Sequence, residues 1–281
     1  MSRPSPPDRI GVVIPARDEQ QLIGPCLDAV ATAAAHPGVA GIPVTVLVVL
    51  DCCRDATAAR CRARATPTLG VELRNVGAVR RAGFAALIGN DGLETARPAG
   101  GGPGPDAVSG SGSGPGGGAL WLATTDADTR VAPDWLTVQL RLARAGADAV
   151  LGIVTVDDWN ELPATLPARY RAGYVRLDGA ERSHPHVHGA NMAVSAAAYL
   201  RAGGMPGLPV GEDHALATRL AALPGVSVVS STALRATTSA RARSRVQGGF
   251  ADHLRALALP RTGPPVRTDG RPVAEADPVT R

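Results

Sequence analysis

The chain has 281 residues, of which 44% are hydrophobic and only 3% aromatic, and its formal net charge is +4. That length can bury a full core in one large domain, which aliphatic side chains and alanine must largely fill. So small a positive charge, without basic stretches interleaved with aromatic residues, argues against a nucleic-acid-binding protein.

From residue 10 to residue 156, short apolar runs alternate with segments of helical pattern. The run at 10–14 stops at Pro15, and the valine-rich run at 44–50 stops at Asp51, as is typical of buried strands. In chain order the predictions are a strand at 10–14, a helix at 18–35, a strand at 44–50, a helix capped by Asp55 and running through 64, a strand at 71–74, a helix at 77–88, a strand at 119–123, a helix from Pro133 and a strand at 147–156. This alternation predicts an α/β fold with a mostly parallel sheet covered by helices on both faces.

Two parts of the chain depart from this pattern. Residues 89–118 consist largely of glycine, proline and serine, which predicts a disordered surface insertion within the domain. The later pattern is weaker: helices are predicted near 162–177, 192–201, 212–223 and 247–258, and a short strand at 226–229. We therefore expect a single domain at 9–258, between a flexible N-terminus at 1–8 and a flexible tail at 259–281.

Acidic residues follow three of the predicted strands, and ligands of parallel sheets bind at the carboxyl ends of strands. Glu19 follows the first strand, Asp51 the second, and Asp126 and Asp128 the strand at 119–123. In an extended segment, Asp126 and Asp128 would point the same way and converge on one divalent cation. Such a cation would stabilise a diphosphate leaving group. The alternative is that these acids serve as helix caps and turn residues.

Six short motifs follow one another along the chain, at residues 12–19, 51–57, 77–83, 125–128, 188–191 and 211–213. In this order and spacing they resemble family 2 glycosyltransferases of the GT-A (Rossmann-like) fold, and the resemblance covers roughly residues 9–257. It implies an inverting enzyme that transfers a sugar from a UDP- or GDP-linked donor to a hydroxyl of a small-molecule, lipid or glycan acceptor.

The resemblance also implies where the donor binds. The implied donor contacts are Pro15, Ala16, Arg17, Glu19, Asp51, Arg80 or Arg81, and Asp126. Asp128, together with Asp126, would hold Mg²⁺ or Mn²⁺ on the diphosphate.

On the acceptor side, Asp213 resembles the family's catalytic base. A hydroxyl is a poor nucleophile, and a carboxylate within hydrogen-bond reach can take its proton as the new bond forms. Around it, the expected acceptor contacts are His188, Gly189, Asn191 and Glu212. The alternative for Glu212 and Asp213 is an acidic helix N-terminus favoured by the helix dipole.

Two further clusters carry polar chemistry. His184, His186 and His188 alternate, so an extended segment would place them on one face, either as a three-histidine metal site or as a loop beside the acceptor. Arg241 and Arg245 precede the last predicted helix, and their guanidinium groups suit phosphate, although a solvated basic loop would look the same.

The chain has four cysteines and no Cys-x-x-Cys pair among them: Cys26, Cys52, Cys53 and Cys61. This spacing predicts free thiols in a reducing compartment. Cys52 and Cys53 stand where the family often has glycine or small polar residues, which leaves the base of the nucleotide open. The N-terminus has no apolar signal core, and the apolar run at 44–50 is too short to span a bilayer. We expect a cytoplasmic protein without a transmembrane segment; peripheral membrane contact stays open.

Three rival classes fit less well. A nucleotidyltransferase would need a glycine-rich loop with a basic residue after the first strand, which residues 15–19 lack. A dinucleotide-dependent oxidoreductase would need a Gly-x-Gly-x-x-Gly motif there. A protein that binds nucleotide-sugar without turnover would not need Asp126, Asp128 and Asp213 together.

Overall fold

The structure is a computed structural model that describes residues 6–89, 119–156, 159, 166–168, 170 and 184–239. Several predictions concern parts of the chain outside these residues. They are the N-terminus at 1–5, nearly all of the insertion at 89–118, most of the helix at 162–177, the helix at 247–258, the tail at 259–281, and Arg241 and Arg245.

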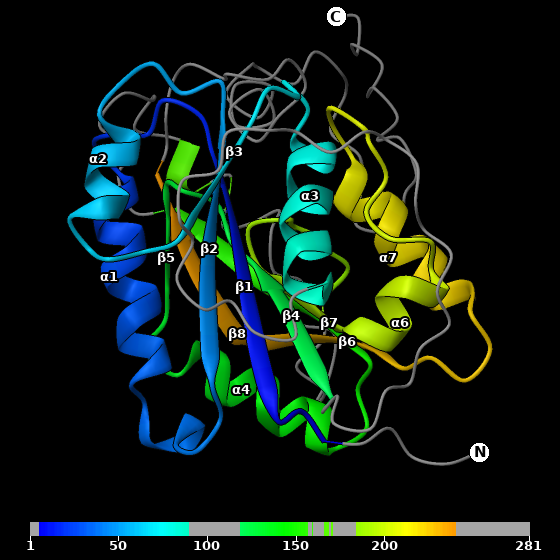
Figure 1. Ribbon diagram of the computed structural model, residues 1–281. Coiled ribbons are helices and arrows are strands. Elements are labelled where there is room, and N and C mark those ends of the chain that lie inside the picture. Colours follow the sequence, from blue (N-terminus) through cyan, green and yellow to red (C-terminus); the bar gives the residue numbers. More distant parts are fainter. Residues whose placement is uncertain are drawn as a thin grey trace, which may run out of the picture.

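Eight strands form one sheet in the order β3-β2-β1-β4-β7-β6-β8-β5 (Figure 1). Their bounds are β1 Arg9–Ala16, β2 Val44–Asp51, β3 Thr68–Val71, β4 Leu120–Thr124, β5 Thr129–Val131, β6 Ala149–Val156, β7 Met192–Ser195 and β8 Val228–Thr238. Strands β3, β2, β1 and β4 are parallel, and so are β6 and β8. Strand β7 is antiparallel to both β4 and β6, and β5 is antiparallel to β8. The carboxyl ends of β1, β2 and β4 therefore share one edge of the sheet.

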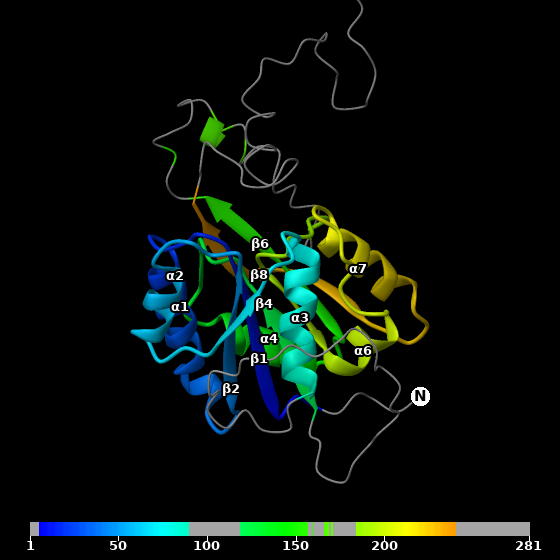
Figure 2. The ribbon, with the colours of Figure 1, turned by 45° about the horizontal axis from the view of Figure 1, so that its top comes forward.

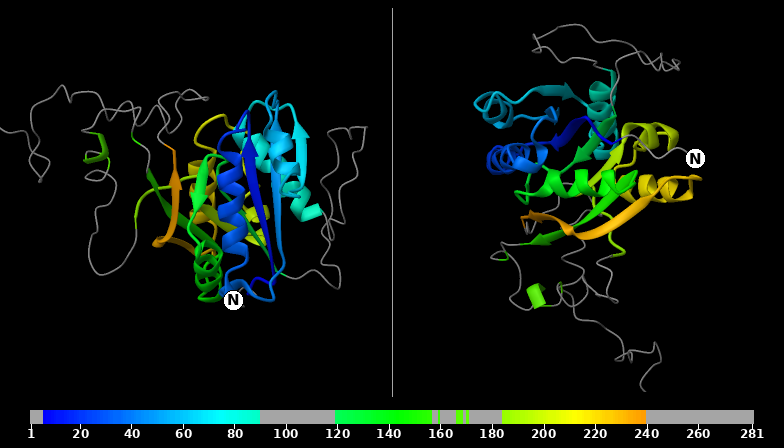
Figure 3. Two further views of the ribbon diagram at one scale, coloured as in Figure 1. Left: turned by 90° about the vertical axis from the view of Figure 1, so that its left-hand side faces the viewer. Right: turned by 90° about the horizontal axis from the view of Figure 1, so that it is seen from below.

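Helices cover both faces of this sheet, as predicted. Their bounds are α1 Ile23–Ala34, α2 Thr57–Arg62, α3 Val76–Gly89, α4 Trp135–Arg144, α6 Ala196–Arg201 and α7 Glu212–Ala222, with a 3₁₀ turn at Pro37–Val39. Helices α1 and α2 lie on one side of the sheet, and α3, α6 and α7 on the other (Figure 2). Seen from the side of α1, that helix and α4 lie in front of the strands (Figure 3).

Each face of the sheet has its own apolar core. Strand β1 shows why, because alternate side chains of a strand point to opposite faces. Its Val12 belongs to the core under α1 and α4, where Trp135 is fully buried, whereas Val13 belongs to the core under α3, where Phe84 is buried. A strand covered on both faces must be apolar throughout, which is the pattern seen in the sequence.

Several element boundaries differ from the predictions. Strand β3 begins at Thr68 rather than near residue 71, and α1 begins at Ile23 because residues 17–22 form a loop. The helix predicted at 192–201 is wrong in its first four residues, which form β7 between β4 and β6. Strand β5 was not predicted, and β8 is much longer than the strand predicted at 226–229.

The prediction about the cysteines agrees with the structure. All four cysteines are free. Among the residues described, none of the helices has the length and apolar character needed to cross a membrane.

Candidate active site

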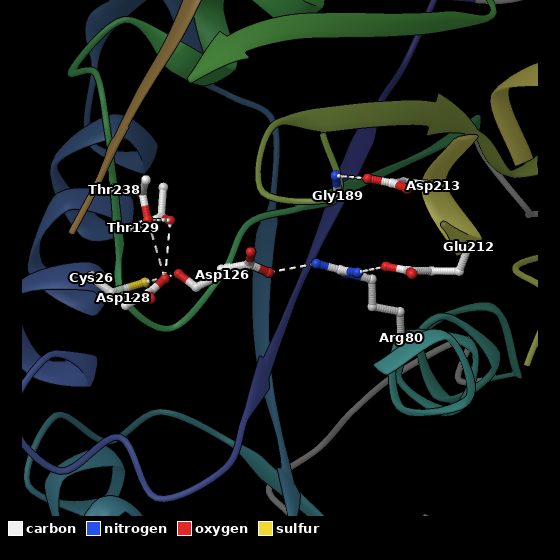
Figure 4. Close-up of polar contacts among 9 residues, drawn as sticks. All are labelled: Cys26, Arg80, Asp126, Asp128, Thr129, Gly189, Glu212, Asp213 and Thr238. Atoms are coloured by element: carbon white, nitrogen blue, oxygen red, sulfur yellow. Dashed lines mark hydrogen bonds and ion pairs between the residues drawn. The ribbon is translucent and has the colours of Figure 1, made fainter. Parts of the chain in front are cut away.

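The end of β4 leads into a tight turn that carries Asp126 and Asp128. The Thr129 N–H donates to the Asp126 carbonyl oxygen at 3.0 Å, which closes the turn. The extended conformation expected for this segment is therefore absent. Figure 4 shows the carboxylate of Asp126 pointing toward Arg80 and that of Asp128 toward Thr129 and Thr238. The two acids thus face different partners. We call residues 126–129 the acid turn.

Arg80 joins the acid turn to the start of α7. From α3, its Nη2 donates to Asp126 Oδ1 at 2.5 Å, while its Nη1 forms an ion pair with Glu212 Oε1 (Figure 4). Arg80 is 3% exposed and Glu212 4% exposed. A buried charge is tolerated only when it is paired and hydrogen-bonded. The bridge therefore fixes three separate elements around one guanidinium group.

The charges in this cluster depend on one another. Burial alone would lower the pKa of Arg80, but the carboxylates of Asp126, Glu212 and Asp213 outweigh it and hold that pKa above its ordinary value. Burial raises the pKa of Glu212, against the opposing effect of Arg80. The guanidinium therefore stays charged, and it partly neutralises three acids gathered at one edge of the sheet.

Asp213 lies in the first turn of α7, directly after Glu212. Its Oδ2 accepts a hydrogen bond from the Gly189 N–H at 2.7 Å, and its Oδ1 accepts one from the His214 N–H at 2.8 Å. An acid in the first turn of a helix is favoured by the helix dipole, as the alternative interpretation expected. The same contacts also hold the carboxylate in one orientation while leaving the residue partly exposed.

Asp128 is held by the hydroxyl groups of two neighbouring strands. Its Oδ1 accepts hydrogen bonds from Thr129 at 3.3 Å and from Thr238 at 3.4 Å, and the two threonine hydroxyls lie 3.1 Å apart. Carboxylate oxygens are the ligands that Mg²⁺ and Mn²⁺ prefer. The residues thus fit a divalent cation at Asp128, with Asp126 close by in the same turn.

Such a cation would need ligands from elsewhere. In the described part of the chain, no group of three or more histidine, cysteine, aspartate or glutamate side chains could hold a metal ion. Magnesium is commonly bound by one or two carboxylates together with substrate phosphates and water. A diphosphate would therefore have to complete this site.

A buried cysteine supports the acid turn from α1. The Cys26 thiol donates to the Asp126 carbonyl oxygen at 3.3 Å (Figure 4). Burial, with the nearby carboxylates of Asp128, Asp126 and Glu19, raises the pKa of Cys26 well above its ordinary value. The thiol therefore stays protonated and remains a donor.

The loops that follow β1 and β2 interlock at the same edge of the sheet. Four hydrogen bonds, each from a backbone N–H of one loop to a side chain of the other, join them: Arg54 to Asp18 (2.7 Å), Gln20 to Asp55 (2.9 Å), Glu19 to Thr57 (2.7 Å) and Ala56 to Gln20 (3.0 Å). We call these contacts the loop latch. Asp55 also accepts from the Thr57 N–H at 2.9 Å, but the N-cap residue of α2 is Ala56, so the predicted cap at Asp55 lies one residue too early.

The remaining residues expected at the donor lie around this latch. Pro15 and Ala16 end β1, Arg17 is exposed, and Glu19 is 9% exposed. Asp51 ends β2 and is buried. Its Oδ1 accepts the backbone N–H groups of residues 73 and 74, at 2.8 and 3.0 Å.

The two adjacent arginines of α3 separate completely. Arg80 is buried in the acid cluster, whereas Arg81 is exposed on the helix surface. The sequence left open which of them approaches the donor; in the structure, Arg80 is the one that contacts Asp126.

The three alternating histidines do share one face. The rings of His184 and His186 are 5.9 Å apart and nearly parallel, and those of His186 and His188 are 6.0 Å apart. Burial lowers the pKa of His188 to about 4, although Asp213 opposes that shift. His188 is therefore neutral near pH 7 and lies close to Asp213.

Asn191 has a different environment from the one expected beside an acceptor. Its side chain is fully buried: Oδ1 accepts from Trp135 Nε1 at 2.8 Å, and Nδ2 donates to the carbonyl oxygens of Ile153 (2.7 Å) and Leu234 (3.0 Å). These contacts tie α4, β6 and the β8 strand together. Asn191 thus anchors the segment that carries His188 and Gly189.

Some residues of the site carried no recognisable signal in the sequence. Cys26 looks like any core residue of α1, and Thr238 lies in a part of β8 that the apolar pattern did not predict. Thr129 directly follows the Asp-x-Asp motif, but its role depends on the pairing of β5 with β8. Only the assembled sheet brings the two threonines together.

A mostly parallel α/β sheet, with acids at the ends of β2 and β4 and an acid pair at a later helix, is typical of glycosyltransferase domains of the GT-A class. Residues 6–255 match the family model described as glycosyltransferase like family 2, and the chain belongs to that family. A search of curated proteins found no match.

Solved structures share the fold at low sequence identity. Staphylococcus aureus TarS 1-349 in complex with UDP-GlcNAc has a TM-score of 0.54 and 12% identity, over 89% of this chain and 65% of that one. The mannosyltransferase PcManGT from Pyrobaculum calidifontis, in complex with GDP-Man and Mn²⁺, has a TM-score of 0.53 and 20% identity, over 87% and 62%. This chain thus spans less than two thirds of either.

A third similar structure is glucosyl-3-phosphoglycerate synthase from Mycobacterium tuberculosis, in complex with Mn²⁺, UDP-glucose and phosphoglyceric acid. Its TM-score is 0.51 and its identity 18%, over 89% of this chain and 76% of that one. At these identities the three likenesses establish the fold alone.

Proposed function

We propose that the protein is a metal-dependent, inverting glycosyltransferase that moves a sugar from a UDP- or GDP-linked donor to a hydroxyl of a small-molecule, lipid or glycan acceptor. The observation that carries this proposal is the Arg80 bridge. It links Asp126, at the end of β4, to Glu212, whose chain neighbour is Asp213. Asp126, expected on the donor side, and Glu212, expected on the acceptor side, are both bonded to Arg80 at one edge of the sheet, and ligands of such folds bind at this edge.

On the donor side, Asp51 and the latched loop at 17–20 would hold the base and ribose, and Asp126 would contact the ribose. Asp128 would hold a divalent cation, which when bound supplies charge neutralisation on the diphosphate. The three similar structures bind UDP-GlcNAc, GDP-Man and UDP-glucose, and two of them contain Mn²⁺. These ligands support a nucleotide-sugar donor for this chain.

On the acceptor side, Asp213 would act as the general base. As it takes the acceptor's hydroxyl proton, the acceptor oxygen attacks the anomeric carbon from the face opposite the diphosphate. The bond from that carbon to the diphosphate breaks with its electron pair on the leaving oxygen, so the anomeric centre inverts. His188, neutral and beside Asp213, would line the acceptor side, and the Gly189 N–H would hold Asp213 in place.

A product analysis tests this proposal. The protein would be incubated with UDP-glucose, UDP-N-acetylglucosamine or GDP-mannose and Mn²⁺, and the nucleotide products separated by ion-exchange chromatography. We expect one donor to release its nucleoside diphosphate, slowly with water as acceptor. Formation of nucleoside triphosphate on addition of pyrophosphate, without release of diphosphate, would instead identify a nucleotidyltransferase.

A further inference from the structure

Gly189 lies directly against the guanidinium group of Arg80. A Cβ atom built at Gly189 would be 2.6 Å from Arg80 Cζ, 2.6 Å from Nη1 and 2.7 Å from Nη2, closer than the 3.0 Å that real Cβ atoms keep. Because the three distances are nearly equal, that carbon would lie over the face of the guanidinium plane. The φ angle of Gly189 is not in the left-handed region. Glycine is required here because a Cβ atom would clash with Arg80, and not because of the backbone conformation.

Arg80 has no room to give way. A flexible arginine on a surface would simply move aside, but this one is 3% exposed and its two Nη atoms are held by Asp126 and Glu212. The far side of the cluster is equally tight, because a Cβ at Gly77 of the same helix would be 2.9 Å from Glu212 Cβ and 2.2 Å from the Pro206 carbonyl oxygen. A methyl group at position 189 must therefore disturb the ion pairs of Arg80.

Gly189 also holds the expected base. Its N–H donates to Asp213 Oδ2 at 2.7 Å, while the neighbouring Glu212 is held by Arg80 (Figure 4). The first turn of α7 is thus fixed by two contacts, and both depend on residue 189: one uses its N–H, and the other uses the space left by its missing side chain.

We propose that Gly189 and Arg80 form one positioning unit for Asp213, and that Gly189 acts through Arg80 rather than by touching the acceptor. The inference rests on the proposed function, because it takes Asp213 as the base. It assigns the arginine a different task from the donor contact implied by the motif. Arg80 sets the distance between the acid turn and α7, so the donor side and the base are aligned by one side chain.

A double-mutant cycle tests this unit. The rate of nucleoside diphosphate release from the donor that the wild type consumes would be measured with Mn²⁺ for Gly189→Ala, Arg80→Gln and the double variant. We expect Gly189→Ala to lower kcat by about 100-fold, since small misplacements of reacting groups cost rates of this order. Donor KM should change much less than kcat, because Asp126 is the expected donor contact that Arg80 holds, whereas Asp51 and the loop latch are not bonded to Arg80. The double variant should be no slower than Arg80→Gln alone.

Gly70→Ala is the matched control, because position 70 has an ordinary φ and nothing within 4 Å of the added carbon. It should leave kcat unchanged. If Arg80→Gln does not fold, Arg80→Lys takes its place in the cycle. The lysine ammonium is narrower than the guanidinium and leaves room for the methyl group at position 189. The double variant Gly189→Ala, Arg80→Lys should therefore have a higher kcat or melting temperature than Gly189→Ala alone.

Two results would overturn the positioning unit. One is a Gly189→Ala variant with normal kcat, and the other is a double variant whose loss in kcat equals the product of the losses in the two single variants. Absence of any nucleoside diphosphate release by the wild type would overturn the proposed function instead. In that case the same cycle in melting temperatures still decides whether Gly189 and Arg80 are coupled.

Discussion

At the scale of single residues, His188 makes the stability of the protein depend on pH, and the sign of this dependence follows from its burial. Burial lowers the pKa of His188 from 6.5 to about 4. Asp213 opposes that shift, whereas three other histidines add to it: His184, His186 and His214. An unfolded chain takes up a proton on His188 near pH 6.5, but the folded protein does so only near pH 4. The contribution of His188 to stability is therefore complete above pH 6.5 and is lost as the pH falls toward 4, by about 3 kcal/mol at most.

His188→Gln removes this titrating group while keeping a polar side chain. We expect the wild type to lose more of its melting temperature than the variant when the pH is lowered from about 7.5 to about 5. The comparison cancels the titration of the surrounding carboxylates to first order. Equal losses for the two proteins would show that His188 titrates normally in the folded state.

Residue identity could be predicted from the sequence better than residue role. The motif drew attention to Arg80 and Arg81 equally, and only the packing of α3 decides which of them is buried. For Asp126 and Asp128, the prediction assumed an extended segment, whereas a turn closed by Thr129 sends the two carboxylates to different partners. Local spacing cannot distinguish those two backbones.

At the scale of elements, the loop latch makes the expected donor edge a preformed structure. Its four hydrogen bonds join loops that are more than 30 residues apart in sequence. Gln20 takes part in two of them, because its N–H donates to Asp55 and its side-chain oxygen accepts from the Ala56 N–H. A site whose loops are already ordered loses less conformational entropy when a ligand binds.

Asp55→Ala should loosen this edge without touching the acids of the site. The change removes the acceptor for the Gln20 N–H and for the N–H and hydroxyl of Thr57. We expect stability to fall by about 1–2 kcal/mol, and the Kd for UDP or GDP with Mn²⁺ to rise by about tenfold in calorimetric titrations.

Asp28→Ala is the matched control for this prediction. Asp28 also accepts from a distant residue, the Arg64 guanidinium at 2.8 Å, but on the exposed face of α1. It should leave nucleotide affinity unchanged. Unaltered affinity in Asp55→Ala as well would show that the latch does not shape the donor site.

The elements of the first half were predictable because each parallel strand is a compact apolar run that ends in a polar residue. In the second half, β7 is only four residues long and owes its strand conformation to its neighbours β4 and β6. Strand β5 has three residues and exists through its pairing with β8. Such short strands depend on distant partners, so a local pattern does not identify them.

At the scale of the whole molecule, the two halves of the sheet bring different parts of the site. The parallel half, from β3 to β4, carries Asp51, the loop latch and the acid turn. The later segments carry Gly189 and Asp213. Arg80, on a helix of the first half, connects the two. The family and the order of its motifs could be predicted from the sequence, but this connection could not, because it joins residues 132 positions apart in a buried cluster.

The account depends most directly on Asp213 as the base, and Asp213→Asn tests it. The asparagine amide oxygen can still accept the Gly189 N–H, so the fold and the donor side should persist. We expect the Kd for UDP or GDP with Mn²⁺ to stay within about threefold of wild type, while donor turnover falls by about 100- to 10,000-fold, as for loss of a general base. Turnover at the wild-type rate in this variant, with binding intact, would contradict the account.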